Sequence, residues 1–159
     1  MMKRRHVIFL AVSLCLLAAM VGFCGLEDKP DTRPLVPEGV PNEWGVTLTA
    51  KNVRRGGLTI VCTQSGGTFS GELSTGAPYW LEEKTEQGWR LMEPDREDLA
   101  WTAEGWMIPV DGTVEWEVRW ASLYGSLKKG TYRIGKSVMD WREAGEYDLQ
   151  SVYAEFTID

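Results

Sequence analysis

The sequence predicts an all-β protein whose body is one antiparallel β-sandwich of about seven or eight strands. Three observations favour this fold class. Short segments alternate apolar and polar residues, turn signals recur about every ten residues, and all eight tryptophans lie in residues 43–159. A stretch of that length suffices for the core of one independent domain, and it shows neither an internal repeat nor a second domain.

The N-terminal segment, residues 1–26, is expected to be a signal peptide or a membrane anchor. Three basic residues at positions 3–5 precede twenty uncharged residues, 7–26. A basic region before an apolar run is typical of a secretory signal, and this run is just long enough to span a bilayer. Three outcomes stay open: lipid attachment at Cys24, despite the bulky Phe23 before it, an uncleaved single span, and plain secretion. Each places the remaining chain outside the cytoplasm, at the cell surface or secreted.

Residues 27–42 predict a Pro-rich linker. The stretch holds four of the seven prolines, which remove backbone donors and favour extended polyproline geometry. At roughly 3.1 Å per residue, such a linker reaches about 50 Å. A disordered tail is the alternative, and both interpretations exclude this stretch from the core.

From Glu43 onward, the apolar residues recur with a period of two. In residues 113–120, Val114, Trp116, Val118 and Trp120 share one face, and charged residues occupy the other. Such alternation is typical of half-buried strands, so we expect the apolar face to point into the core. The same pattern recurs in residues 46–50, 58–62 and 152–158, and the short loop 85–88 is expected to join 79–84 to 89–92 as a hairpin.

Tyr132 is the most specific structural signal in the chain. In immunoglobulin-like sandwiches, a tyrosine near the start of the sixth strand bonds back to the corner before it. Here a turn that ends at Gly130 precedes Tyr132, which predicts such a tyrosine corner. Disulfide-bonded members carry a cysteine two positions later, where this chain has Ile134. Cys62, the single cysteine of residues 43–159, is therefore expected to be a small buried residue without a partner.

An ordered set of short motifs extends this interpretation: GLTI (57–60), QSGG (64–67), YWLE (79–82), GW (88–89), AW (100–101), GTVEWEV (112–118), LKKGTYRIGK (127–136) and YAEF (153–156). In this combination, residues 46–159 resemble a bacterial immunoglobulin-like domain of surface proteins and lipoproteins of Gram-positive, largely clostridial, bacteria. The resemblance implies a β-sandwich, an extracytoplasmic setting and no enzymatic activity. It carries no functional residues over.

The residue types of the body exclude most catalytic chemistry. The one histidine, His6, lies in the N-terminal segment, so residues 43–159 form neither a Ser–His–Asp or Cys–His arrangement nor a mixed Cys/His zinc site. The acidic clusters 82–83 and 93–98 lack the spaced loop of a calcium site. We therefore expect no enzyme, no metal and no cofactor.

The net charge of the mature chain also argues against polyanionic partners. Removing the segment through Cys24 leaves 14 basic against 23 acidic residues, a net charge of about −9. This balance argues against a nucleic-acid partner, and equally against docking on anionic lipid or teichoic acid.

Surface aromatics are the remaining candidate binding residues. Trp80 is out of phase with its neighbours in sequence, and Trp101, Trp106 and Trp141 lie near predicted turns. Exposed rings stack on sugars or on partner proteins, so these four tryptophans are a possible aromatic platform. The alternative is that they cover the open ends of the sandwich.

The expected function is that of a non-enzymatic, membrane-tethered extracytoplasmic module in cell-surface interaction or adhesion. A carbohydrate- or peptidoglycan-binding module that uses surface tryptophans is the alternative, and a hydrolase inhibitor is a third. The partner, protein or glycan, stays open, and the N-terminal segment is the expected contact with the membrane.

Overall fold

The computed structural model describes residues 39–96 and 100–159. Within these residues, nine strands form two antiparallel sheets, and there is a single helical turn. This confirms the all-β prediction. The predicted signal or anchor segment and linker residues 27–38 lie outside the described residues. Linker residue Asn42 is buried, and its side-chain oxygen accepts hydrogen bonds from the backbone N–H groups of Trp44 and Val46.

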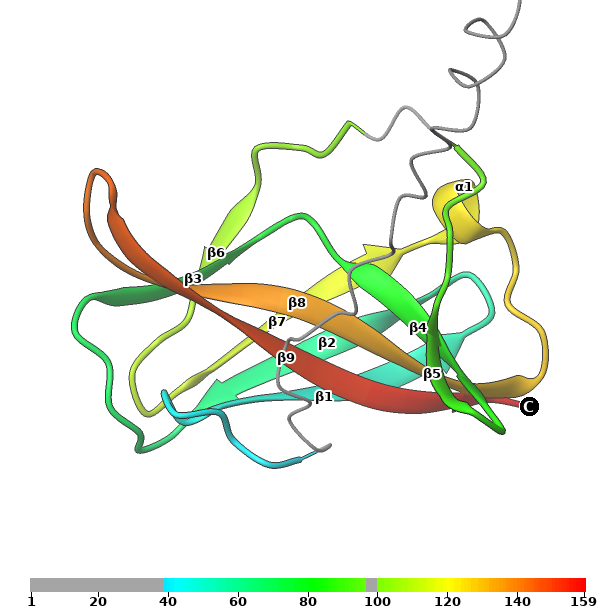
Figure 1. Cartoon of the computed structure of the whole chain (residues 1–159), viewed down its shortest axis with the longest axis horizontal. Coiled ribbons are helices and arrows are strands. Elements are labelled where there is room, and N and C mark those ends of the chain that lie inside the picture. Colours follow the sequence, from blue (N-terminus) through cyan, green and yellow to red (C-terminus); the bar gives the residue numbers. More distant parts are fainter. Residues whose placement is uncertain (1–38, 97–99) are drawn as a thin grey trace, which may run out of the picture. The chain divides into compact units, whose positions relative to one another are not determined.

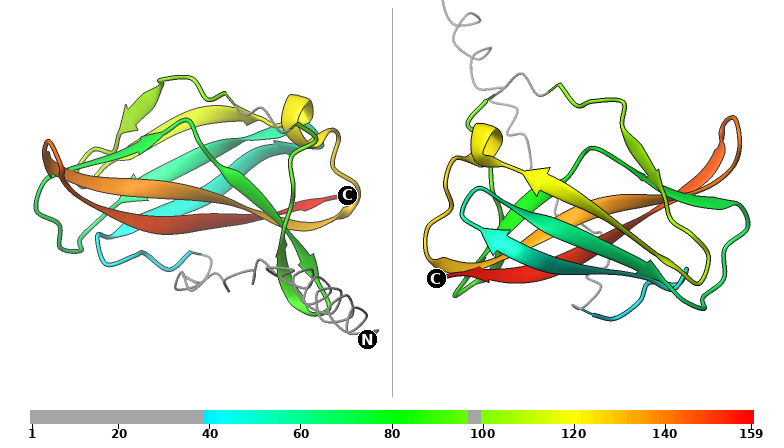
Figure 2. Two further views of the ribbon diagram at one scale, coloured as in Figure 1. Left: turned by 45° about the horizontal axis from the view of Figure 1, so that its top comes forward. Right: turned by 180° about the vertical axis from the view of Figure 1, so that it is seen from behind.

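The two sheets form the two layers of a sandwich (Figures 1 and 2). The three-stranded sheet has the order β1 (Val46–Arg54), β2 (Gly57–Gln64) and β7 (Thr113–Arg119). The six-stranded sheet has the order β5 (Gly88–Leu91), β4 (Trp80–Thr85), β8 (Gly130–Glu143), β3 (Glu72–Gly76) and β6 (Gly105–Met107), and β9 (Glu146–Ile158) pairs with β8. The helical turn α1 (Ala121–Tyr124) follows β7.

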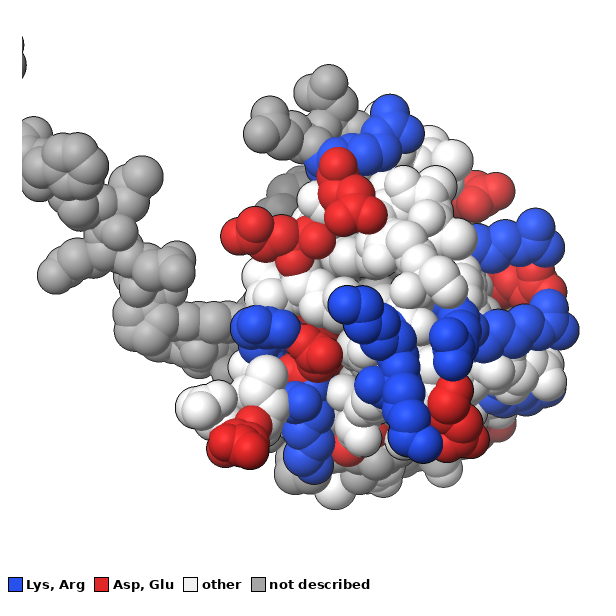
Figure 3. Space-filling model, turned by 90° about the vertical axis from the view of Figure 1, so that its right-hand side faces the viewer, with Lys and Arg blue, Asp and Glu red and all other residues white. Residues whose placement is uncertain are grey.

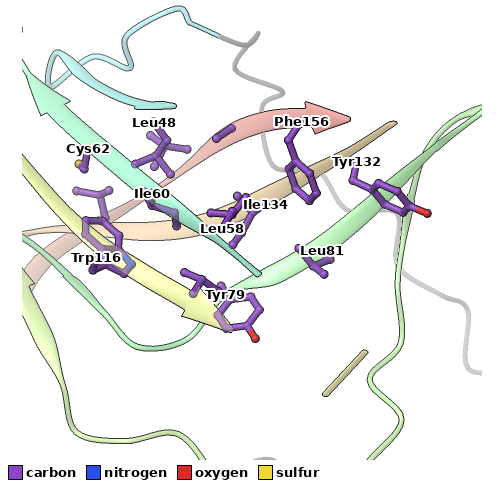
Figure 4. Packing of buried hydrophobic residues seen from close by; sticks show 14 of the residues in the cluster. Leu48, Leu58, Ile60, Cys62, Tyr79, Leu81, Trp116, Tyr132, Ile134 and Phe156 are labelled. Carbon is purple, nitrogen blue, oxygen red and sulfur yellow. The ribbon is translucent and has the colours of Figure 1, made fainter. Parts of the chain in front are cut away.

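The core lies between the sheets and consists of the apolar rows expected from the period of two. On β2, Leu58, Ile60 and Cys62 are at most 4% exposed, and they pack with Leu48 and Ile134 (Figure 4). Cys62 is buried and has a free thiol, as expected. Its inward position follows from strand alternation, because every second residue of a strand faces the same way.

Tyr132 joins the start of β8 to the preceding turn. The ring is buried against Phe156, and its hydroxyl points away from the core cluster (Figure 4). The hydroxyl donates to the carbonyl oxygen of Lys128 over 3.0 Å. A polar group at the margin of the core is thereby satisfied, and the turn is held to the strand.

Four features lie outside the expected strands. The β8–β9 hairpin extends to Glu143 and Glu146, where outward aromatics obscure the alternation. Strand β3 has one large apolar residue, Leu73, and β6 has three residues, so neither is long or apolar enough to show a period. The α1 turn carries no side-chain cap that would mark it in the sequence.

Candidate functional site

The outer face of the six-stranded sheet carries an apolar patch on four adjoining strands. Met107 of β6 lies opposite Ser74 of β3, which lies opposite Met139 of β8, which lies opposite Leu149 of β9. In the next row, Trp141 of β8 lies opposite Tyr147 of β9. We call these five residues the apolar patch: Met107, Met139, Trp141, Tyr147 and Leu149.

Exposure distinguishes this patch from the rest of the surface. The exposed fraction is 57% for Met107, 50% for Tyr147 and 59% for Leu149, and Trp141 is 41% exposed. The described residues include seven large apolar side chains that are exposed, and five lie on this face: Leu91, Met107, Trp141, Tyr147 and Leu149. Single exposed apolar residues are ordinary, but a contiguous group marks an interaction surface.

At its other end, the same sheet face carries a buried ion pair that lies between aromatic rings. The Arg133 Nε atom donates to the Glu82 carboxylate over 2.7 Å, and both residues are buried. The guanidinium carbon lies 4.6 Å from the ring centroid of Trp89 and 4.2 Å from that of Tyr153. The Trp80 indole N–H donates to the other oxygen of the same carboxylate over 3.1 Å. This interlocked cluster holds its aromatic rings in place at that end of the sheet face.

A second feature is a hollow of about 250 Å³ beside β7, which is an edge strand of the three-stranded sheet. We call it the aromatic hollow, since Tyr79, Trp101, Trp106 and Trp116 line it. Tyr79 packs edge-on against Trp101 with ring centroids 5.0 Å apart, and Trp106 stacks on Trp116 at 4.9 Å. Polar residues complete the lining: Thr102, Glu104, Glu117, Arg119 and Ser122.

Two polar groups of the aromatic hollow have clear electrostatic roles. Burial raises the pKa of Tyr79, so its hydroxyl stays protonated and donates to the backbone oxygen of Arg119 over 3.3 Å. The Trp116 indole N–H is buried and has no hydrogen-bond partner among the described residues. An unpaired buried donor costs free energy.

Behind these rings lies a buried cation, Lys136, which is 1% exposed. Its Nζ atom donates to the Gly76 carbonyl oxygen and lies 5.4 Å from the ring centroids of both Trp106 and Trp116. Burial lowers the pKa of this amine to about 8, an effect that the nearby Cys62 thiol partly opposes. Burial likewise raises the pKa of Cys62 to about 12, which leaves it a neutral thiol near neutral pH.

The four tryptophans proposed as a platform separate into two pairs. Trp80 and Trp141 lie on the outer face of the six-stranded sheet, and Trp101 and Trp106 line the aromatic hollow. Met107, Met139 and Leu149 were not candidates from the sequence, because their common face follows from strand register. Trp116 was expected in the core row, and it also lines the hollow. Cys24, the candidate lipid site, lies outside the described residues.

Two further expectations concern metals and membranes. In residues 39–96 and 100–159, no group of three His, Cys, Asp or Glu side chains is arranged to hold a metal ion. Over the same residues, no helix has the length and apolar character that a membrane span requires.

The chain was compared with protein families, curated proteins and solved structures. A family model described as Bacterial Ig-like domain matches residues 42–157, which is most of the chain. No curated protein and no solved structure matches the chain.

Proposed function

Because the chain belongs to the family of bacterial Ig-like domains, we propose that it is a non-enzymatic, membrane-tethered module in cell-surface interaction or adhesion. Domains of this family are generally extracellular and typically non-catalytic. The N-terminal segment, basic at positions 3–5 and apolar over 7–26, is the proposed tether. The proposed partner is a surface protein, and it docks on the apolar patch.

The observation that carries this proposal is the concentration of exposed apolar side chains on one sheet face. Aromatic residues and methionine are enriched in protein interfaces, and the patch consists of Trp141, Tyr147, two methionines and a leucine. Flexible methionines also adapt to the shape of a partner.

The test is saturable binding of the purified full chain to intact cells of the source strain. The double variant Trp141→Ser/Leu149→Ser is expected to lose this binding at least about tenfold, because central apolar anchors dominate interface energies. Val110→Ser is the matched control, since Val110 is 65% exposed and lies outside the sheet face. Protease treatment of the cells should abolish binding, whereas periodate should not. Equal binding by the patch variant and by the control would refute the proposal.

A glycan-binding module is the second candidate function, and the aromatic hollow favours it. Rings suited to stacking on a sugar stand beside polar groups in its lining. Titration with soluble neutral cell-wall glycans, followed by tryptophan fluorescence, tests it. Trp101→Ala should remove the spectral response, and Trp89→Ala, on the other sheet face, should retain it. A response that survives in Trp101→Ala excludes this site.

A further inference from the structure

The net negative charge of the chain hides a separation of charge along the sandwich. At the end where β1 meets β2, the basic residues Arg54, Arg55, Arg119, Lys128 and Lys129 gather. The Leu127 backbone N–H donates to the Arg55 carbonyl oxygen, and Gly57 lies opposite Arg119 in the sheet. Figure 3 shows Lys and Arg side chains across this end, with acidic side chains between them. The opposite end is mainly acidic: Glu72, Asp111, Glu143, Glu146 and Asp148.

Most of these cations have no carboxylate to neutralise them. No ion pair engages Arg54, Arg55, Lys128 or Lys129 within the part of the chain that the structure describes. The Arg55 guanidinium donates to the backbone oxygen of Asp159 instead. In contrast, Lys51 pairs with Glu115, and Arg142 lies near Asp140 and Asp148. The charges of Arg54, Lys128 and Lys129 are therefore available to an external anion.

A hollow of about 250 Å³ opens at this end, on the outer face of the three-stranded sheet. We call it the arginine hollow, since Arg54 and Arg119 line it together with Asn52, Thr59 and Glu117. Gly57, opposite Arg119, leaves its floor without a side chain. Gly56, Leu58 and Val118 complete the lining, and guanidinium groups such as these two bind phosphate or carboxylate.

The local backbone supports a site built for recognition. The register of β1 against β2 shifts between Lys51 and Arg54, and Asn52 adopts a φ of 54°. Asparagine tolerates this left-handed conformation, which other side chains seldom adopt. The Asn52 amide then donates to the Thr59 hydroxyl over 3.3 Å, at the rim of the hollow. Bulges commonly re-aim side chains next to binding sites.

Glu117 shows how an anion fits there. Its carboxylate lies 2.8 Å from an Arg119 guanidinium nitrogen, yet both side chains are well exposed, at 65% and 83%. Such an exposed pair is weak, so a ligand anion can replace the carboxylate at little cost. Glu117 and Arg119 also line the aromatic hollow, so the two hollows adjoin at β7.

We propose that the arginine hollow and the neighbouring cations Arg55, Lys128 and Lys129 bind a linear polyanion whose charges are phosphate groups. Several separated cations suit a repeated charge better than a single small anion, and both arginine forks and lysine point charges bind phosphate. The inference rests on the proposed function only for the extracytoplasmic setting. Its ligand surface is distinct from the apolar patch.

The test measures binding of a poly(glycerol phosphate) oligomer to the full chain at low salt. The double variant Arg54→Gln/Arg119→Gln should weaken binding about tenfold or more, since each charge-assisted contact is strong. Glu117→Gln should tighten it by about two- to fivefold, because the resident carboxylate is removed. Raising the salt concentration toward about 1 M should abolish binding, where the Debye length falls to about 3 Å.

Arg142→Gln at the acidic end is the matched control and should bind as the wild-type chain does. All substituted side chains are exposed apart from the half-buried Arg142, and unchanged melting temperatures will show that the fold is intact. The proposal is overturned if the wild-type chain does not bind the oligomer, or if the double variant binds it equally well. It is also overturned if polygalacturonate or phosphatidylglycerol vesicles bind through the same arginines more tightly than the oligomer. The apolar-patch variant should lose cell binding but still bind the oligomer. That result would show that the phosphate site and the proposed function can be tested independently.

Discussion

Replacing Lys136 with methionine is expected to make the stability of the domain less dependent on pH. The amine is buried, and its folded-state pKa of about 8 lies below the ordinary 10.5 of a lysine in the unfolded chain. At pH values below 8, both states carry the charge, but the folded state holds it away from water. The folded state therefore gains stability as the pH rises from about 8 toward about 10.5, and loses it as the pH falls.

The magnitude follows from the two pKa values. A difference of about 2.5 units corresponds to about 3 kcal/mol of destabilisation near pH 7. About 2 kcal/mol of this is expected to be recovered by about pH 9.5. Methionine has a similar volume and no charge, and water can satisfy the Gly76 carbonyl because Gly76 is exposed. The variant loses two ring contacts, each worth about 1 kcal/mol, so its net gain near pH 7 is about 1 kcal/mol.

The assay is urea unfolding followed by tryptophan fluorescence, at a series of pH values from about 7 to about 9.5. The stability advantage of Lys136→Met over the wild-type chain should shrink by about 2 kcal/mol across this range. Lys51→Met is the control, because Lys51 is an exposed lysine that pairs with Glu115, and its difference from the wild-type chain should stay nearly constant. A constant difference for Lys136→Met would refute the argument that this amine is held in the core at the expense of stability.

Three further predictions concern stability and reactivity. Tyr132→Phe removes the hydrogen bond to the Lys128 carbonyl and should lower the free energy of unfolding by about 1 kcal/mol, as measured by urea unfolding. Arg133→Met leaves the Glu82 carboxylate buried without its cation and should lower the free energy of unfolding by about 3–5 kcal/mol. The double variant Arg133→Met/Glu82→Gln should recover much of this loss. An equal loss in the single and the double variant would contradict the prediction. Cys62 should not react with thiol reagents near pH 8 until the domain unfolds, because it is 0% exposed and its pKa is about 12; mass spectrometry of its peptide detects labelling.

The strand faces could be predicted because alternation is a local property. Leu58, Ile60 and Cys62 face inward as expected, and Trp116 and Val118 do so on β7. Lys136 shows the limit of this approach. Lys136 lies on the same strand face as Ile134 and Val138, but a sequence pattern gives no reason to expect a lysine in the core. Its burial depends on the Gly76 carbonyl and two indole rings, which are brought to it from β3, β6 and β7.

The candidate surfaces depend on which strands lie side by side. Met107, Met139 and Leu149 are dispersed in the sequence and become a patch only in the register β6–β3–β8–β9. Arg54 and Arg119, on β1 and β7, likewise line one hollow, although the net negative charge of the chain argues against an anionic partner. Period-two alternation specifies the inward side of strands such as β2 and β7, and with it the all-β class. Neighbours across strands depend on long-range pairing and register, which no local pattern encodes, so the folded sheets alone create the patch and the hollows.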